Sequence, residues 1–519
     1  MSFDRVLKKV GKRLSAYERT VAARETTKAA QTILDPAAQV EAAELWRSAQ
    51  PADAGRPSHL EALRLAEARR VVGKAHLYRA REVPSGQWLH EFAQGLVYLA
   101  PITGRPGAVP PGYELLLGPA ADPDQQAGLA VEMLGADAAT EDGVFADAAV
   151  VLLTESLAAT PRTSAGYVTR LSNLGAAHQS RYHRTGDAAE LDAAHGLLER
   201  TVAAAARSDP NLPLYQYNLG GSQLRKYSRS RSPLDALAAV VSLDQALAGL
   251  PQDSGLRREA MSMAVTAHRA CAATVAGGAQ DLERAIRLCR ELLDTAEEGS
   301  GDRAKFRTEL GMLLLQRFLD DGRRRDLDLA IESLRDAVVA TPEDHPERAE
   351  RLSRLGIAHR RRYEVRRTVQ DLELAVAWGE QSVAADCALP SDRAGHYSNV
   401  GLAYRERYQR FGEPGDLDRA VAYGEDAVRT YPADNLDRAI ALHNLGTAYQ
   451  RRFERTNARA DVDLAIDVAE QAVAITPPGH PYLAERQAGL RRAYEARHAH
   501  SGDPADLLRA QRSGNGQRP

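Results

Sequence analysis

The chain has 519 residues, and its 67 Lys and Arg residues against 70 Asp and Glu residues give a formal net charge of −3. This near balance disfavours a strongly basic nucleic-acid binder as a description of the whole chain. Hydrophobic residues make up 44% of the sequence, enough for a buried core, while the 5% aromatic content and the short apolar runs favour packed helices and predict no membrane-spanning segment.

The N-terminal region, residues 1–122, is predicted to be helical. Residues 72–76, with the sequence Val-Gly-Lys-Ala-His, repeat a pattern found further along the chain, so we expect a diverged repeat or a cap here. Residues 1–28 are rich in Lys and Arg but lack the apolar stretch of a secretory signal. We interpret them as a surface helix, with contact to nucleic acid or an anionic surface as the alternative.

An internal repeat organises residues 123–510. A glycine recurs at intervals of 45 residues, with one interval of 91 residues that contains a unit centred on Val265 without the glycine. These glycines are Gly175, Gly220, Gly311, Gly356, Gly401 and Gly446. The pattern predicts eight units preceded by one degenerate unit, and it leaves residues 511–519 as a disordered tail.

Each unit is predicted to form two antiparallel helices. After Gly401, the small or apolar residues Leu417, Ala420, Val421 and Gly424 follow the i, i+3, i+4, i+7 spacing of an amphipathic helix. Proline lacks an amide hydrogen, so the prolines that recur behind this segment are predicted to end the second helix. They are Pro161, Pro251, Pro342, Pro432 and Pro477.

The units resemble the tetratricopeptide repeat (TPR). They share its Leu-Gly pair, an aromatic residue or His three residues later, alanine early in the second helix and a closing proline. The resemblance implies an all-α, right-handed superhelical solenoid of antiparallel helix pairs. The period is 45 residues rather than the family's 34 or so, and such long units resemble the TPR arrays of actinobacterial proteins that carry a caspase-like CHAT protease domain. No CHAT domain is recognisable in this sequence.

Two charged columns are predicted to form structural ion pairs within the units. A cation stands six residues after the glycine and an acid fifteen residues after it. The acid precedes the second helix, where a carboxylate can cap free amide groups and meet the positive end of the helix dipole. We favour this structural role over ligand binding. The predicted pairs are Arg181 with Glu190, Arg362 with Asp371, Arg407 with Asp416, and Arg452 with Asp461.

Two further sets are predicted to line a peptide-binding groove. An asparagine stands two residues before the glycine in four units, at Asn173, Asn218, Asn399 and Asn444. In the TPR family this position faces the groove, and the pattern is similar to the asparagine ladders of O-GlcNAc transferase and kinesin light chains. An amide both donates and accepts, so it can hold a peptide backbone. The open alternative is a bond to the neighbouring helix.

Arginines four or five residues after the glycine form the second set. They are Arg225, Arg269, Arg360, Arg361, Arg405 and Arg451. A positive lining of this kind would prefer an acidic peptide or a carboxylate. The alternative is a solvated helix face without a ligand.

The sequence predicts no enzyme. It contains neither a phosphate-binding loop nor the spacing of a metal site, so we expect no catalytic residue, metal or cofactor; a hydrolytic function would depend on Cys387. Three cysteines in 519 residues exclude a disulfide scaffold and favour the cytoplasm. The predicted function is a scaffold or adaptor that binds an extended peptide or partner helix, in a signalling or defence assembly. The alternative is nucleic-acid or anionic-surface binding through the basic N-terminus and the arginines.

Overall fold

The computed structural model describes residues 2–51, 57–103, 109–111, 113–114, 116–117, 121–137, 140, 143–274, 278–387, 389–433, 435–480 and 482–514. The regular structure in these residues consists of α helices and one short 3-10 helix, η1 (Ala100–Ile102), and contains no strand. The predicted all-α class is therefore confirmed.

The chain forms two compact units, Met1–Cys271 and Ala272–Pro519, which we call the N-terminal and C-terminal units. The division falls inside helix α12 (Gly255–Thr274). The predicted domain boundaries at residues 122 and 510 stay a prediction. Helix α6 begins at Pro123 and helix α23 ends at Gly514, so the first four residues of the predicted tail are helical and its last five lie outside the described residues.

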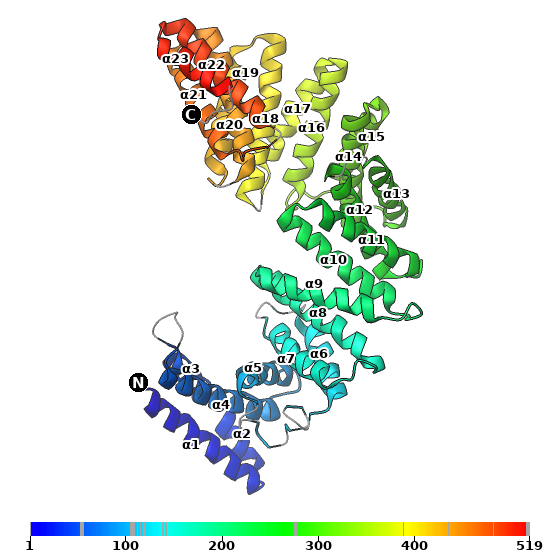
Figure 1. The fold of residues 1–519 in the computed structure, drawn as a ribbon, viewed down its shortest axis with the longest axis vertical. Helices are drawn as coiled ribbons and strands as arrows, with labels where there is room; N and C mark the ends of the chain where they lie inside the picture. Colours follow the sequence, from blue (N-terminus) through cyan, green and yellow to red (C-terminus); the bar gives the residue numbers. More distant parts are fainter. Residues whose placement is uncertain are drawn as a thin grey trace. The chain divides into compact units, whose positions relative to one another are not determined.

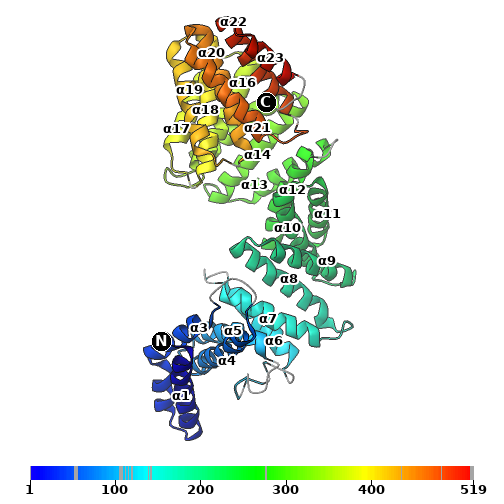
Figure 2. The same cartoon turned by 60° about the vertical axis from the view of Figure 1, so that its left-hand side comes forward.

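The N-terminal unit begins with five helices that pack on one another (Figure 2). Their bounds are α1 (Phe3–Ala22), α2 (Thr26–Leu34), α3 (Pro36–Ala49), α4 (His59–Glu82) and α5 (Trp88–Leu99). Val6 and Val10 of α1 are buried against Leu45 of α3 and Val72 of α4. Helices α1 to α4 therefore share one apolar core, while buried residues of α5 such as Phe92 and Leu96 belong to a second cluster that includes residues of α6 and α7.

Helix pairs follow in chain order, as Figure 1 shows for both units. In the N-terminal unit they are α6 (Pro123–Asp137) with α7 (Val144–Ala159), α8 (Ala165–Thr185) with α9 (Ala188–Ala204), and α10 (Leu212–Ser230) with α11 (Pro233–Gly249). In the C-terminal unit, α13 (Ala279–Thr295) precedes α14 (Gly301–Asp321) with α15 (Arg324–Val339), α16 (Arg348–Arg366) with α17 (Val369–Ala384), α18 (Pro390–Phe411) with α19 (Pro414–Thr430), α20 (Leu436–Thr456) with α21 (Arg459–Ile475), and α22 (Leu483–Ser501) with α23 (Pro504–Gly514).

The recurrent glycine lets the two helices of a pair approach closely. A Cβ atom built at Gly311 would lie 2.6 Å from Cγ of Leu334, so only glycine fits this packing without movement. The turn that follows the first helix needs a left-handed residue, which is Gly322 after α14 (φ 70°) but Arg367 after α16 (φ 58°). Glycine adopts this conformation at little cost, whereas arginine does so against its preference.

The second helices end where the prolines predict. Helix α19 ends at Thr430, two residues before Pro432, and helix α21 ends at Ile475, two residues before Pro477. The residue before each of these two prolines, Tyr431 and Thr476, has extended rather than helical backbone, as expected from the clash with the proline ring.

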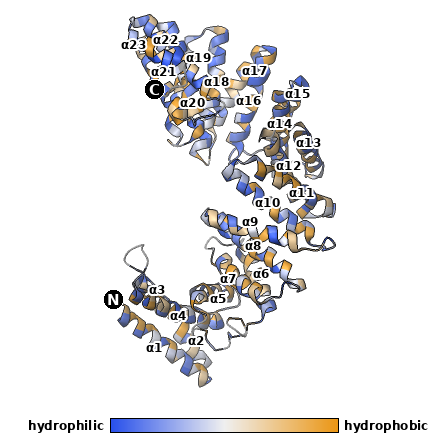
Figure 3. Ribbon diagram, viewed as in Figure 1, coloured by the Kyte–Doolittle hydropathy of each residue, from blue (hydrophilic) through white to orange (hydrophobic). Residues whose placement is uncertain are grey.

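The first helices form a continuous face in the C-terminal unit. Each second helix packs on the first helix of the next pair, and the first helices α14, α16, α18, α20 and α22 also contact one another in sequence. We call the exposed side of these five helices the first-helix face. Figure 3 shows hydrophilic and hydrophobic residues intermixed along the helices. Among the described residues, no helix is both long enough and apolar enough to cross a membrane.

Candidate binding face of the first helices

The predicted ion pairs lie within bonding distance. Nη2 of Arg407 lies 2.6 Å from Oδ1 of Asp416, and Nε of Arg407 lies 2.9 Å from the other carboxylate oxygen. The corresponding distances are 2.6 Å for Arg362 with Asp371, 2.7 Å for Arg452 with Asp461 and 3.0 Å for Arg181 with Glu190. Each arginine leaves the first helix and reaches the start of the second, so the pair fixes the turn between them.

Several arginines at this position of the repeat, including Arg362, Arg497 and Arg317, also bond to an acid of the preceding repeat unit, a contact that the sequence analysis missed. Nη1 of Arg362 lies 3.2 Å from Oδ1 of Asp328 on α15, and Nη1 of Arg497 lies 2.8 Å from Oδ1 of Asp463 on α21. Nη1 of Arg317 lies 2.8 Å from Glu283 on α13. The sequence does carry a signal, because an acid recurs two residues after each predicted acid. These arginines therefore join consecutive pairs and are occupied by two carboxylates.

The electrostatics of the Arg362 site follow from this arrangement. Burial by itself would raise the pKa of the Asp371 carboxyl, but hydrogen bonds from Arg362 and His359 hold that pKa below its ordinary value. The bond to Asp371 in turn raises the pKa of Arg362. Both groups are charged at neutral pH, which fits a structural ion pair.

A further arginine column, also missed from the sequence, caps the ends of second helices. Nη1 of Arg303 donates to the carbonyl oxygens of Leu293 and Ala296 at 2.9 and 3.0 Å, at the C-terminus of α13. Arg348 does the same at the end of α15, where it donates to the carbonyl oxygen of Val338 at 3.2 Å. A cation there meets unsatisfied carbonyls and the negative end of the helix dipole.

The asparagine column of the C-terminal unit bonds to neighbouring first helices. Nδ2 of Asn399 donates to Oγ of Ser353 on α16 at 3.1 Å, and Nδ2 of Asn444 donates to Oγ of Ser398 on α18 at 3.5 Å. Such bonds to a neighbouring helix are what the alternative interpretation of the asparagine column expects. An amide that donates to one serine keeps its carbonyl oxygen as an acceptor for a peptide N–H.

The predicted residues of the N-terminal unit lie on α8, α10 and α12. Asn173 and Asn218 are half-buried, and the backbone carbonyl of Asn218 accepts a hydrogen bond from Nε2 of Gln179 at 3.2 Å. Nη2 of Arg225 lies 2.8 Å from Nε2 of His183, and burial lowers the pKa of both side chains. Arg269 is half-buried on α12.

Most arginines of the C-terminal positive lining are paired with glutamates. Arg360 and Arg361 both bond to Glu364 on their own helix, at 2.7 and 2.9 Å. Arg360 also lies 2.8 Å from Glu406 on α18. Arg451 likewise bonds to Glu454, three residues along α20, at 2.8 Å. These glutamates neutralise much of the charge that the sequence alone predicts for this face.

Arg405 differs from its neighbours. Its half-buried side chain lines a cavity of about 10 Å³, next to Ser398 and Asn444, and within the described part of the chain it makes no hydrogen bond or ion pair. Burial lowers the pKa of Arg405, and the positive charges of Arg360 and Arg451 act in the same direction, while Glu406 opposes them. A buried Nε without a partner on a half-buried guanidinium is costly, so this site favours the arrival of an anion.

A second charged group on the first-helix face gives a testable pH dependence. Glu350 of α16 lies 3.9 Å from Nε2 of His396 and also pairs with Arg354. The bond to His396, with a further contribution from Arg354 and against the effect of burial, lowers the pKa of Glu350 from 4.5 to about 2. The charged carboxylate therefore stabilises the fold at neutral pH.

We expect Glu350→Gln to lower the melting temperature at pH 7 and to lose this effect in acid. A carboxyl whose pKa is depressed by folding contributes stability above its unfolded pKa, and this stability is lost as the pH falls through the folded pKa. The difference between variant and wild type should therefore shrink between pH 4.5 and about 2. Thermal unfolding followed by circular dichroism measures it. Glu332→Gln, at an exposed position on α15, serves as the control; a pH-independent difference would contradict the expectation.

Cys387, on which a hydrolytic function would depend, lies in the connection between α17 and α18. In the described ranges, no group of three or more His, Cys, Asp and Glu side chains could hold a metal ion. The thiol of Cys387 donates to the carbonyl oxygen of Leu389, two residues away, at 3.4 Å. All three cysteines are free thiols.

Fold and face together define an all-α repeat protein whose first helices present a continuous surface in the C-terminal unit. Residues 438–482, which cover α20 and α21, match the family model of the tetratricopeptide repeat. The chain therefore contains a tetratricopeptide repeat, within an array of helix pairs built in the same way. No curated protein matches the sequence.

Several solved structures are similar to this chain. The crystal structure of MamA is 21% identical over 38% of this chain and 89% of its own, with a TM-score of 0.26. A kinesin-light-chain-like TPR protein of Podosopora anserina is 22% identical over 43% and 98%, with a TM-score of 0.32. A monomeric mutant of IFIT1 with Gppp-AAAA is 12% identical over 98% and 94%, with a TM-score of 0.40. Because these scores lie below 0.5, we build the function on the residues of this chain alone.

Proposed function

We propose that the chain is a non-enzymatic scaffold or adaptor that binds an extended peptide or a partner helix on the first-helix face of the C-terminal unit. The observation that carries the proposal is the unpaired guanidinium of Arg405 on α18, whose Nε is buried without a partner. Neighbouring arginines of the same face, such as Arg360 and Arg451, are bonded to glutamates. Arg405 is thus a half-buried position on this face that lacks an anion.

The ligand that best complements this position carries an Asp or Glu side chain or a terminal carboxylate. A guanidinium binds a carboxylate through two parallel hydrogen bonds, which are among the stronger hydrogen bonds in proteins. Asn444 borders the same cavity, and Asn399 lies on the same helix as Arg405. Their carbonyl oxygens supply acceptors for the backbone N–H groups of the bound segment.

A peptide selection on the full chain tests this proposal. Random 12-residue peptides displayed on phage are selected against the wild-type protein, and the affinities of enriched peptides are measured by calorimetry. We expect Asp or Glu in the enriched peptides and a 10- to 100-fold weaker affinity for Arg405→Gln, because a hydrogen bond to a charged group contributes about 1.5–3 kcal/mol. Arg429→Gln is the control, since Arg429 is 73% exposed on the second helix α19. Enrichment of peptides without acids, or equal binding by the Arg405 variant, would contradict the proposal.

The salt dependence of the binding affinity distinguishes the alternative, nucleic-acid binding, from the proposed peptide binding. The basic helix α1 offers fewer free cations than its sequence suggests, because Lys9 and Arg13 both bond to Glu41 at 3.0 Å. Binding of single-stranded RNA that falls by several orders of magnitude between 50 and 200 mM salt would favour the alternative.

We further propose that the protein acts in the cytoplasm and, from its resemblance to long-period TPR arrays, in a signalling or defence assembly.

A further inference from the structure

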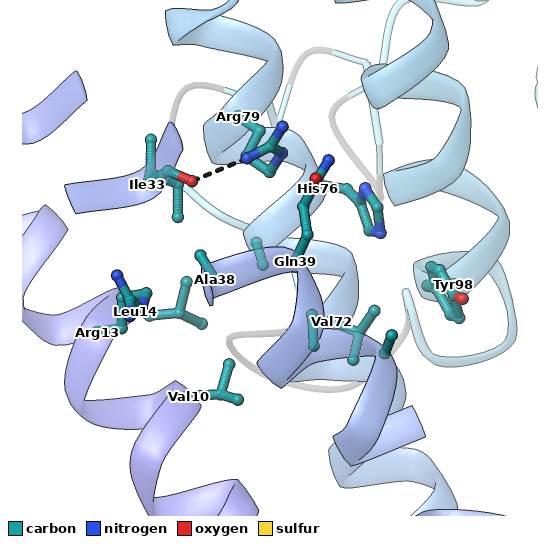
Figure 4. A pocket seen from close by; sticks show the side chains of 13 residues that line it. Val10, Arg13, Leu14, Ile33, Ala38, Gln39, Val72, His76, Arg79 and Tyr98 are labelled. Carbon is teal, nitrogen blue, oxygen red and sulfur yellow. Dashed lines mark hydrogen bonds between the residues drawn. The ribbon is translucent and has the colours of Figure 1, made fainter. Parts of the chain in front are cut away.

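A cavity of about 220 Å³ lies among helices α1 to α5 at the start of the N-terminal unit. It is remote in sequence from the residues discussed above. Its walls come from α1 to α4, with Tyr98 contributed by α5. Figure 4 shows Val10, Leu14 and Val72 on one side of it and Arg79, Gln39 and His76 on another. A largely apolar cavity of 150 Å³ can hold a benzene molecule, so this one has room for a single ring or a short alkyl chain.

Two side chains on the polar side of the cavity, Arg79 and His76, are held in place by hydrogen bonds, whereas Gln39 is exposed at its edge. Nε of Arg79 donates to Oε1 of Glu91 at 2.9 Å, and Nη1 of Arg79 donates to the carbonyl oxygen of Ile33 at 3.0 Å (Figure 4). Nδ1 of His76 lies 2.8 Å from the other oxygen of Glu91. The ring of His76 stacks on Tyr98 with centroids 5.6 Å apart. The buried Glu91 thus holds the guanidinium of Arg79 and the imidazole of His76 at the wall of the cavity.

Hydrogen-bonding capacity remains on this polar side. Nη2 of Arg79 makes no hydrogen bond to any residue that the structure describes, and it is not among the buried polar atoms that lack a partner, so it remains accessible from the cavity. The amide of Gln39 lies between Arg79 and His76 in Figure 4. The residues that line the cavity include two arginines and one histidine but no Asp or Glu. The acids that contact the lining residues, Asp35, Glu41 and Glu91, are already bonded to cations.

We propose that this cavity binds a small amphipathic carboxylate, with one aromatic ring or a short alkyl chain as its apolar body. The carboxylate accepts hydrogen bonds from Nη2 of Arg79 and from the amide of Gln39. The apolar body lies against Val10, Leu14 and Val72. A donor-rich end without an acid selects an anion over an amine, and the apolar walls select against inorganic anions and short polar acids. This site is independent of the peptide-binding face, so either can exist without the other.

The test measures binding of octanoate and benzoate to the full chain by calorimetry, with 1-octanol and octylamine as the neutral and cationic counterparts. Two variants address the two ends of the cavity. Ala38→Leu fills the apolar space beside Leu14, and Gln39→Glu places a carboxylate next to Arg79. Ala37→Leu, at an exposed position of the same helix that does not line the cavity, is the matched control. Circular dichroism verifies that each variant is folded.

We expect the wild type and Ala37→Leu to bind at least one of the two acids, and Ala38→Leu to lose this binding. Gln39→Glu should weaken acid binding at least tenfold and leave the binding of 1-octanol unchanged. Three results would overturn the proposal. The first is that neither acid binds to the wild type. The second is that octylamine binds as tightly as octanoate. The third is that acid binding persists in both Ala38→Leu and Gln39→Glu, because the acid then binds elsewhere.

Discussion

Replacement of Arg317 by methionine is expected to lower the free energy of unfolding by about 3–5 kcal/mol, the usual effect of breaking a buried ion pair from one side. Arg317 is 9% exposed and donates two hydrogen bonds to Asp326, at 2.7 and 2.8 Å. Its Nη1 also bonds to Glu283. Methionine keeps much of the packing volume but leaves Asp326, which is 5% exposed, without its cation. Urea unfolding of the full chain, followed by circular dichroism, measures the loss.

Arg323→Met is the matched control for this experiment. Arg323 bonds to the same Glu283 at 3.1 Å, but its side chain is 51% exposed, so its removal should cost less than about 1 kcal/mol. A second comparison uses the double variant Arg317→Met/Asp326→Leu, which removes both charges and should recover much of the lost stability. Equal losses for Arg317→Met and Arg323→Met would show that burial does not decide the strength of these pairs.

Two glycines of the same column should respond to alanine with opposite signs. A Cβ atom at position 311 would lie 2.6 Å from Cγ of Leu334, which is fully buried, so Gly311→Ala must displace packed groups at a cost of about 1–3 kcal/mol. At position 401 the nearest atom, the carbonyl oxygen of Ala420, would lie 3.4 Å away, an ordinary contact. There the higher helix propensity of alanine should raise stability by up to about 1 kcal/mol.

Thermal unfolding of the two single variants and the wild type checks this expectation. The two substitutions are chemically identical and both lie on first helices of the C-terminal unit, so each is the control of the other. A lower melting temperature for Gly311→Ala together with an unchanged or higher one for Gly401→Ala is the expected result. Destabilisation by both variants to the same extent would contradict it.

The sequence predicts the helix pairs because local signals determine them. Apolar spacing marks each helix, and a proline marks the end of the second one. It also predicts that Arg407 and Asp416 lie close together, because nine residues around a short turn leave little freedom. The second partners of arginines such as Arg362 and Arg497 could not be predicted, for a physical reason. Asp328 lies 34 residues before Arg362, so their contact depends on how consecutive pairs stack.

The position of an arginine within the repeat does not predict whether it has an acidic partner on the first-helix face. Arg360 and Arg405 occupy the same column, but Glu364 stands four residues after Arg360, while Gln409 stands four residues after Arg405. The cavity within residues 1–122 could not be predicted from the sequence either. Its walls come from helices that share no period, so no repeated spacing indicates which side chains meet.

The arginines that bond to two consecutive pairs also constrain how such an array can grow. Arg362 and Arg497 each take one acid from their own unit and one from the unit before. Duplication or deletion of a whole 45-residue unit places an equivalent arginine against equivalent acids, so every charge at the new junction finds a partner. An insertion of another length within a pair displaces one acid and leaves a half-buried charge alone. Gene changes in multiples of the repeat are therefore the ones that this fold tolerates.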